Sequence, residues 1–133
     1  MIHRILKIGH WEVDFLFAHS GYNDEEVLTY LYEIDAPISV MRRANKIMES
    51  GRMNRGFTFA NPYMKRAVVV TGPTTSSKQF LNTFTHEVHH LAVAIAKSIG
   101  YELDSEGPAY ITGDTTMALA ETICELGCEH CNG

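Results

Sequence analysis

Long apolar runs are absent from the 133-residue sequence, and its first residues lack the apolar core and cleavage site of a signal peptide. A helix needs about 20 mostly apolar residues to span a bilayer, so we expect no membrane partner. An excess of positive charge is also absent, because the formal net charge is -5. Proteins that bind nucleic acids usually carry a basic surface, so we expect no nucleic-acid partner. An intracellular, cytoplasmic protein is the simplest expectation.

Cysteine is scarce, and the three residues present are bunched near one end as Cys124-x3-Cys128-x2-Cys131. An odd number in one cluster does not suit the disulfide framework of a secreted protein. Radical iron–sulfur enzymes share this spacing, but they carry it early in a large barrel. Reduced thiols are the default interpretation, and a small structural zinc site on the three cysteines and His130 is the alternative.

The rest of the composition is that of a globular protein, with 45% hydrophobic and 20% charged residues and no repeats or low-complexity segments. A chain of this length forms one domain, here residues 1–133, and buries roughly two-thirds of its unfolded surface.

Hydrophobic periodicity and turn residues divide the chain into strands followed by helices. The expected strands are a hairpin over 2–8 and 11–18, then 57–60 and 66–71. The expected helices are 24–34, 37–50, 77–99 and 106–127. This order predicts an α+β fold with a small, mostly antiparallel sheet covered by helices.

A possible metal-binding motif lies in the middle of the third expected helix, in the segment His86-Glu87-Val88-His89-His90. Residues four apart share one helix face, with Cβ atoms about 5–6 Å apart. Two imidazoles at this separation can bind one zinc ion, and the glutamate beside the first can act on a water bound to that ion. The motif therefore predicts zinc on His86 and His90, with Glu87 as a general base. The alternative is that His86 and His90 are ordinary surface histidines on a long helix.

A catalytic zinc site needs a third protein ligand and an open position for water. We expect Glu106 to be the third ligand, at the start of the last helix. That helix has a face of small residues that could pack closely on the motif helix. Tyr110, one turn further, is a candidate to stabilise the oxyanion of the reaction, although an ordinary packed tyrosine is an equal alternative. Other acids compete with Glu106, namely Glu102, Asp104, Asp114 and Glu121.

The segment from Phe80 to Ala92 reads FLNTFTHEVHHLA, and Glu106 is followed by Ala109-Tyr110. Together they resemble small metallopeptidases encoded by tailed bacteriophages and prophages, which belong to the zincins with a glutamate third ligand (gluzincin-like). The resemblance covers roughly Ser76 to Glu121. It implies a minimal zincin-like domain with zinc on His86, His90 and Glu106, and Glu87 as the general base. It also implies that an edge strand beside the motif helix lines the substrate cleft, and the strand 66–71 immediately precedes that helix.

Three functions follow from these features. The first is a zinc-dependent metallopeptidase or amide hydrolase that acts on a peptide or protein substrate, in the bacterial host cell. The second is a phage virion or assembly component that keeps the zinc-binding domain without turnover and contacts phage structural proteins. The third is a metal-free interaction module. The presence of Glu87 favours the first, because a purely structural zinc site has no use for a general base.

Overall fold

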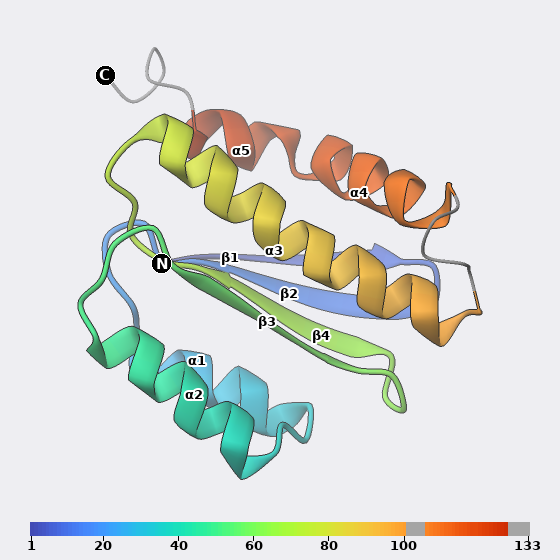
Figure 1. Ribbon diagram of the computed structural model, residues 1–133, viewed down its shortest axis with the longest axis horizontal. Helices are drawn as coiled ribbons and strands as arrows, with labels where there is room; N and C mark the ends of the chain where they lie inside the picture. Colours follow the sequence, from blue (N-terminus) through green and yellow to red (C-terminus); the bar gives the residue numbers. More distant parts are fainter. Residues whose placement is uncertain (101–105, 128–133) are drawn as a thin grey trace.

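The computed structural model describes residues 1–100 and 106–127, which form three layers (Figure 1). The middle layer is a sheet of four strands: β1 (Ile2–Ile8), β2 (Trp11–Phe17), β3 (Gly56–Asn61) and β4 (Arg66–Thr71). Their order is β1-β2-β4-β3. β2 and β4 run parallel, whereas β1 pairs with β2 and β3 pairs with β4 in antiparallel fashion. The predicted α+β class and the predicted hairpin are therefore confirmed, and the sheet is mixed.

Helices cover both faces of this sheet (Figure 1). α1 (Asp24–Glu33) and α2 (Ile38–Glu49) lie on one face, and α3 (Ser77–Ser98) crosses the other. α4 (Gly107–Ala118) and α5 (Ala120–Gly127) lie alongside α3. Among the described residues, no helix has both the length and the apolar composition needed to cross a membrane.

The two faces of the sheet bury separate sets of side chains because successive strand residues point to opposite faces. On β2, the side chains of Trp11, Val13, Phe15 and Phe17 belong to the core under α3. Leu16 belongs to the core under α1 and α2. The β-branched run of β4 is divided in the same way, with Val69 on the α3 side and Val68 and Val70 on the other. This explains why β4 reads as a continuous apolar run.

The motif helix forms where the sequence predicts it. The Ser76 hydroxyl accepts a hydrogen bond from the backbone N–H of Gln79 at 3.1 Å, which caps the first turn of α3. Gly100 follows the last turn with φ +82°, a conformation that glycine adopts without steric cost. The periodicity of the sequence predicts seven buried positions on this helix, namely 80, 81, 84, 88, 91, 92 and 95. Six of them are buried, and Leu81 is the exception, with 41% of its surface exposed. The six are Phe80, Phe84, Val88, Leu91, Ala92 and Ile95.

The C-terminal part of the fold differs from the prediction in two ways. The expected continuous helix 106–127 is divided at Leu119, whose backbone leaves the helical conformation and whose side chain is buried. The prediction that the face of small residues on this helix packs against the motif helix was also wrong. That face, which also carries Tyr110 and Met117, is exposed. α4 instead buries Ile111 and Thr115. Burying a larger apolar side chain such as Ile111 removes more apolar surface from water than burying a row of small residues does.

The strand beside the motif helix also differs from what the resemblance implied. β4 is an interior strand with β2 on one side and β3 on the other. The edge strand is β3, and it packs against α3. The edge strand next to α3 is therefore β3, residues 56–61, and not the strand 66–71.

We predict that Leu91→Ala lowers the free energy of unfolding by about 2–5 kcal/mol, because Leu91 is fully buried between α3 and the sheet. Leu81→Ala is the matched control on the same helix, and it should cost much less because Leu81 is 41% exposed. Urea denaturation followed by circular dichroism measures both. Equal losses for the two variants would contradict this packing of α3.

Candidate functional site

The two histidines of the motif converge on the outer surface of α3. The Nε2 atoms of His86 and His90 lie 3.2 Å apart, and the two rings stand nearly perpendicular, with centroids 4.8 Å apart. Both side chains are exposed. The pair results from the i, i+4 spacing on one face of a regular helix, and the buried stripe of α3 turns that face away from the sheet.

This spacing fits two ligands of one zinc ion. Two nitrogens bound to the same ion at about 2.0–2.1 Å with a near-tetrahedral angle lie about 3.3 Å apart. The 3.2 Å between the Nε2 atoms agrees with that value. The same distance is that of a hydrogen bond between the two rings, so the geometry is compatible either with a directly bonded pair or with two ligands of one ion.

Glu87 lies on a different side of α3 and is 5% exposed. The Thr58 hydroxyl on β3 donates a hydrogen bond to Glu87 Oε1 at 2.9 Å and lies 3.3 Å from the backbone oxygen of Glu87. A buried carboxylate is costly unless hydrogen bonds or charges compensate it. Thr58 therefore holds the carboxylate in one orientation between α3 and the edge strand.

A small polar pocket of about 230 Å³ opens beside Glu87 and His86. Its remaining lining comes from the segment leading into β3 and from the first half of α3: Asn54, Arg55, Gly56, Asn82 and Thr83. In the part of the chain that the structure describes, no carboxylate lies within ion-pair distance of Arg55. The pocket, referred to below as the polar pocket, thus combines a candidate base, an imidazole and a guanidinium group.

Tyr22 adds a second polar group near Glu87. Its hydroxyl is buried and has no hydrogen-bond partner among the described residues, and a Cβ added at Gly72 would collide with it. Burial raises the pKa of the Tyr22 hydroxyl above 10.0, as do the carboxylates of Asp24 and Glu87, whereas the Arg55 guanidinium lowers it. The Tyr22 hydroxyl is therefore close enough to Arg55 and to Glu87 for each to affect its pKa. The sequence offered no signal for this cluster, because its members come from separate segments.

The structure does not bring Glu106 to the histidine pair. Glu106 is exposed and lines a different pocket together with Ile95 and Ile99. These isoleucines follow His90 by five and nine residues, which is about 7–14 Å further along the helix axis. Among residues 1–100 and 106–127, no three His, Cys, Asp or Glu side chains form a group that could hold a metal ion.

The other candidates from the sequence are also away from the pair or outside the described residues. Tyr110 is 66% exposed and lines the same pocket as Glu106, as does Asp114. Glu121 and Cys124 are exposed on α5. Five remaining candidates fall outside the residues that the structure describes: Glu102, Asp104, Cys128, His130 and Cys131.

Comparisons of this chain with protein-family models, with curated proteins and with solved structures give no match. A function must therefore be inferred from the chemistry of the site itself.

We predict that Gly56→Ala destabilises the protein by about 1–3 kcal/mol. A Cβ at Gly56 would lie 2.6 Å from the backbone oxygen of Val70 and 2.9 Å from Glu87 Cγ, so the glutamate side chain must shift. Gly113→Ala is the control, because a Cβ there meets nothing within 4 Å. Alanine is also the better helix former, so this variant should be neutral or slightly more stable. Chemical denaturation distinguishes the two, and an unaffected Gly56→Ala variant would contradict the close packing of Glu87 on β3.

Proposed function

We propose that this protein is a zinc-dependent hydrolase of amide or peptide bonds, with a zincin-like arrangement of its motif helix. The observation that carries the proposal is the convergence of His86 Nε2 and His90 Nε2 at 3.2 Å, next to a buried Glu87 that Thr58 holds in place. Two exposed imidazoles alone would also be compatible with ordinary surface histidines that bind no metal. The adjoining carboxylate, fixed by a hydrogen bond, is what a hydrolytic site requires in addition.

When bound, a zinc ion lowers the pKa of its water to about 7 and polarises the carbonyl of the substrate. His86 and His90 would hold the ion. Glu87 would accept the proton of the attacking water and then pass it to the departing amine. Thr58 holds Glu87 Oε1, and no donor among the described residues is within hydrogen-bond distance of Glu87 Oε2. Oε2 is therefore the oxygen that we assign to the proton transfer.

The polar pocket gives this chain a means of orienting a substrate. Arg55, Asn54 and Asn82 line it beside His86 and Glu87. Their side chains can donate hydrogen bonds, and carbonyl or carboxylate oxygens of a peptide can accept them. Arg55 has no carboxylate partner in the described residues, so its guanidinium is available for an anionic group of the substrate.

We predict that the full chain binds about one zinc ion, and that His86→Ala and His90→Ala each weaken binding at least tenfold, because each removes one of two convergent nitrogens. His89→Ala is the matched control, since His89 is exposed on the same helix and its ring lies 6.3 Å from that of His90. Competition with a chromophoric chelator measures the affinity. Undiminished zinc binding by both His86→Ala and His90→Ala would overturn the proposed site.

The same measurement decides the third ligand. Glu106 stays a prediction from the sequence and the resemblance, because the structure places it near Ile95 and Ile99. A tenfold or greater loss of zinc affinity in Glu106→Gln would make Glu106 the third ligand. An unchanged affinity would remove Glu106 from the ligand set and leave the imidazoles of His86 and His90.

We further predict that Glu87→Gln lowers hydrolysis of a fluorogenic peptide library about 100-fold or more while zinc binding is retained, because the amide cannot accept the proton. The control is Glu125→Gln, which changes an exposed glutamate on α5 and should leave hydrolysis unchanged. Wild-type protein that binds zinc and hydrolyses nothing in the library would instead favour the virion or assembly component without turnover.

A further inference from the structure

The helices α1 and α2 carry charges of opposite sign that the chain itself does not pair. They lie side by side on the sheet face opposite α3 (Figure 1). α1 has four acidic residues and no basic residue, whereas α2 has three basic residues and one acidic residue. None of the ion pairs among the described residues involves either helix. Two neighbouring helices therefore present opposite charge to the surroundings.

The outer face of α1 is defined by three exposed residues at helical spacing. Val27 and Leu31 are buried on the sheet side of this helix. Glu25, Thr29 and Tyr32 are exposed on the opposite side, because residues three or four apart share one face. The Tyr32 side chain is 75% exposed. The acid and the aromatic ring lie at the two ends of this face, about 10 Å apart along the helix axis.

The outer face of α2 has a matching pattern with the opposite charge. Ala44 and Met48 are buried on the sheet side of this helix. Ile38, Arg42 and Lys46 are exposed on the other side, at intervals of four residues. The Ile38 side chain is 70% exposed. Ile38 and Lys46 are about 12 Å apart along the helix axis. Each outer face therefore has a large apolar side chain and a charge at nearly the same separation.

The two outer faces can pair with each other across a two-fold axis. The helices are antiparallel and joined by a short connection, so Tyr32 and Ile38 lie at the same end of the helix pair (Figure 1). A two-fold axis parallel to the helices places α1 of one copy on α2 of the other. Tyr32 then meets Ile38 and Glu25 meets Lys46, and each contact occurs twice. The acid of α2, Glu49, lies about 4–5 Å further along the axis than Lys46, past Glu25 of the other copy.

We propose that two copies of this chain associate through the outer faces of α1 and α2 as a symmetric dimer. A second copy fits because the two faces complement each other, whereas a partner of one charge sign would be repelled by one of the helices. The helices are only about 15 and 18 Å long. The interface is therefore at the small end of the range for specific protein contacts, and the dimer is weak and sensitive to salt.

Sedimentation equilibrium of the full chain tests the association, with a chelator present so that metal ions cannot link the copies. We expect the weight-average mass to rise from that of one chain toward that of two at submillimolar concentration. We expect it to fall back in about 1 M salt, where the Debye length is about 3 Å. The mass of a single chain at every concentration would overturn the proposal.

Exchanging the charges tests the pairing itself. Glu25→Lys and Lys46→Glu each bring like charges together at both contacts, so each should weaken association about tenfold or more. Both residues are exposed, so the core stays intact. Mixing the two variants should restore association, because the charges are again opposite across the interface. Unchanged association of either variant alone, or no recovery on mixing, would refute this arrangement of the helices.

The apolar contact has a matched control elsewhere on the surface. Ile38→Asp should abolish association, because it places a carboxylate against Tyr32. Met117→Asp changes a side chain that is 73% exposed on α4, on the other side of the sheet, and should leave association unchanged. Equal effects of the two variants would contradict the proposed interface. None of these readouts uses zinc or hydrolysis, so the dimer can fail while the proposed hydrolase stands, and the reverse.

Discussion

The packing of α3 against the sheet is the constraint on which the rest of the structure depends. Phe84, Val88 and Leu91 are buried on the sheet side of this helix, and their positions fix its rotation about its own axis. At about 100° per residue, this rotation turns His86 and His90 outward and turns Glu87 toward β3. A helix rotated by one residue in either direction would bury at least one of the imidazoles of His86, His89 and His90. The hydrophobic core therefore sets the orientation of His86, His90 and Glu87, although none of the core residues takes part in the proposed chemistry.

The buried position of Glu87 has a cost that the fold offsets locally. The Thr58 hydroxyl supplies one hydrogen bond to its carboxylate, and Gly56 leaves room for its side chain next to the backbone of Val70. The Tyr22 hydroxyl lies near this carboxylate, which helps to raise the pKa of that hydroxyl, whereas Arg55 lowers it. A carboxylate held in this way at the floor of a polar pocket is preorganised, which is how protein sites reduce the cost of positioning a reacting group.

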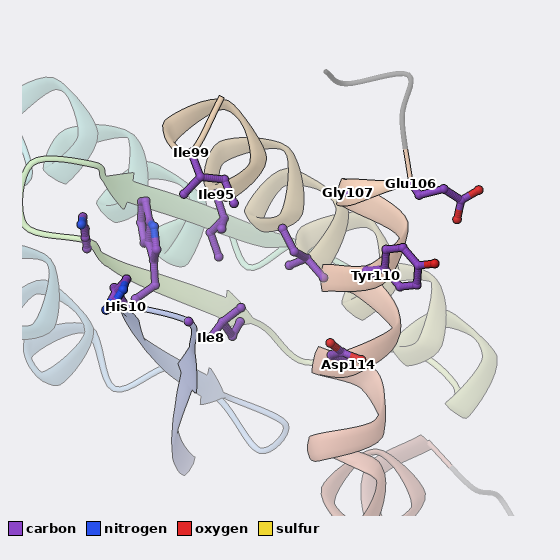
Figure 2. Close-up of a pocket in the computed structure, with 12 residues that line it drawn as sticks. Ile8, His10, Ile95, Ile99, Glu106, Gly107, Tyr110 and Asp114 are labelled. Carbon is purple, nitrogen blue, oxygen red and sulfur yellow. The ribbon is translucent and has the colours of Figure 1, made fainter. Parts of the chain in front are cut away.

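The two pockets divide α3 into regions of different character. The polar pocket lies next to the first half of the helix and uses the edge strand β3 as its other wall. A second pocket, of about 730 Å³, lies at the end of the helix and uses the β1–β2 turn and α4 (Figure 2). β1 and β3 are opposite edges of the sheet, so the two pockets form against different edges. Glu106 and Tyr110 line this second pocket, whereas His86 lines the polar pocket.

Local signals in the sequence were sufficient for the α+β class, for most element boundaries and for the pairing of His86 with His90, because each depends on periodicity or caps within one segment. Tertiary structure alone decided which face of α4 is buried, the division of the last helix at Leu119, and the choice of β3 over β4 as the edge beside α3. It also decided that Thr58, Arg55 and Tyr22 surround Glu87 and that Glu106 does not join the histidines. These outcomes depend on contacts between segments distant in the chain, where the burial of Ile111 and Leu119 competes with the packing of small residues. The sequence pattern within one segment does not indicate which of these packings is more stable.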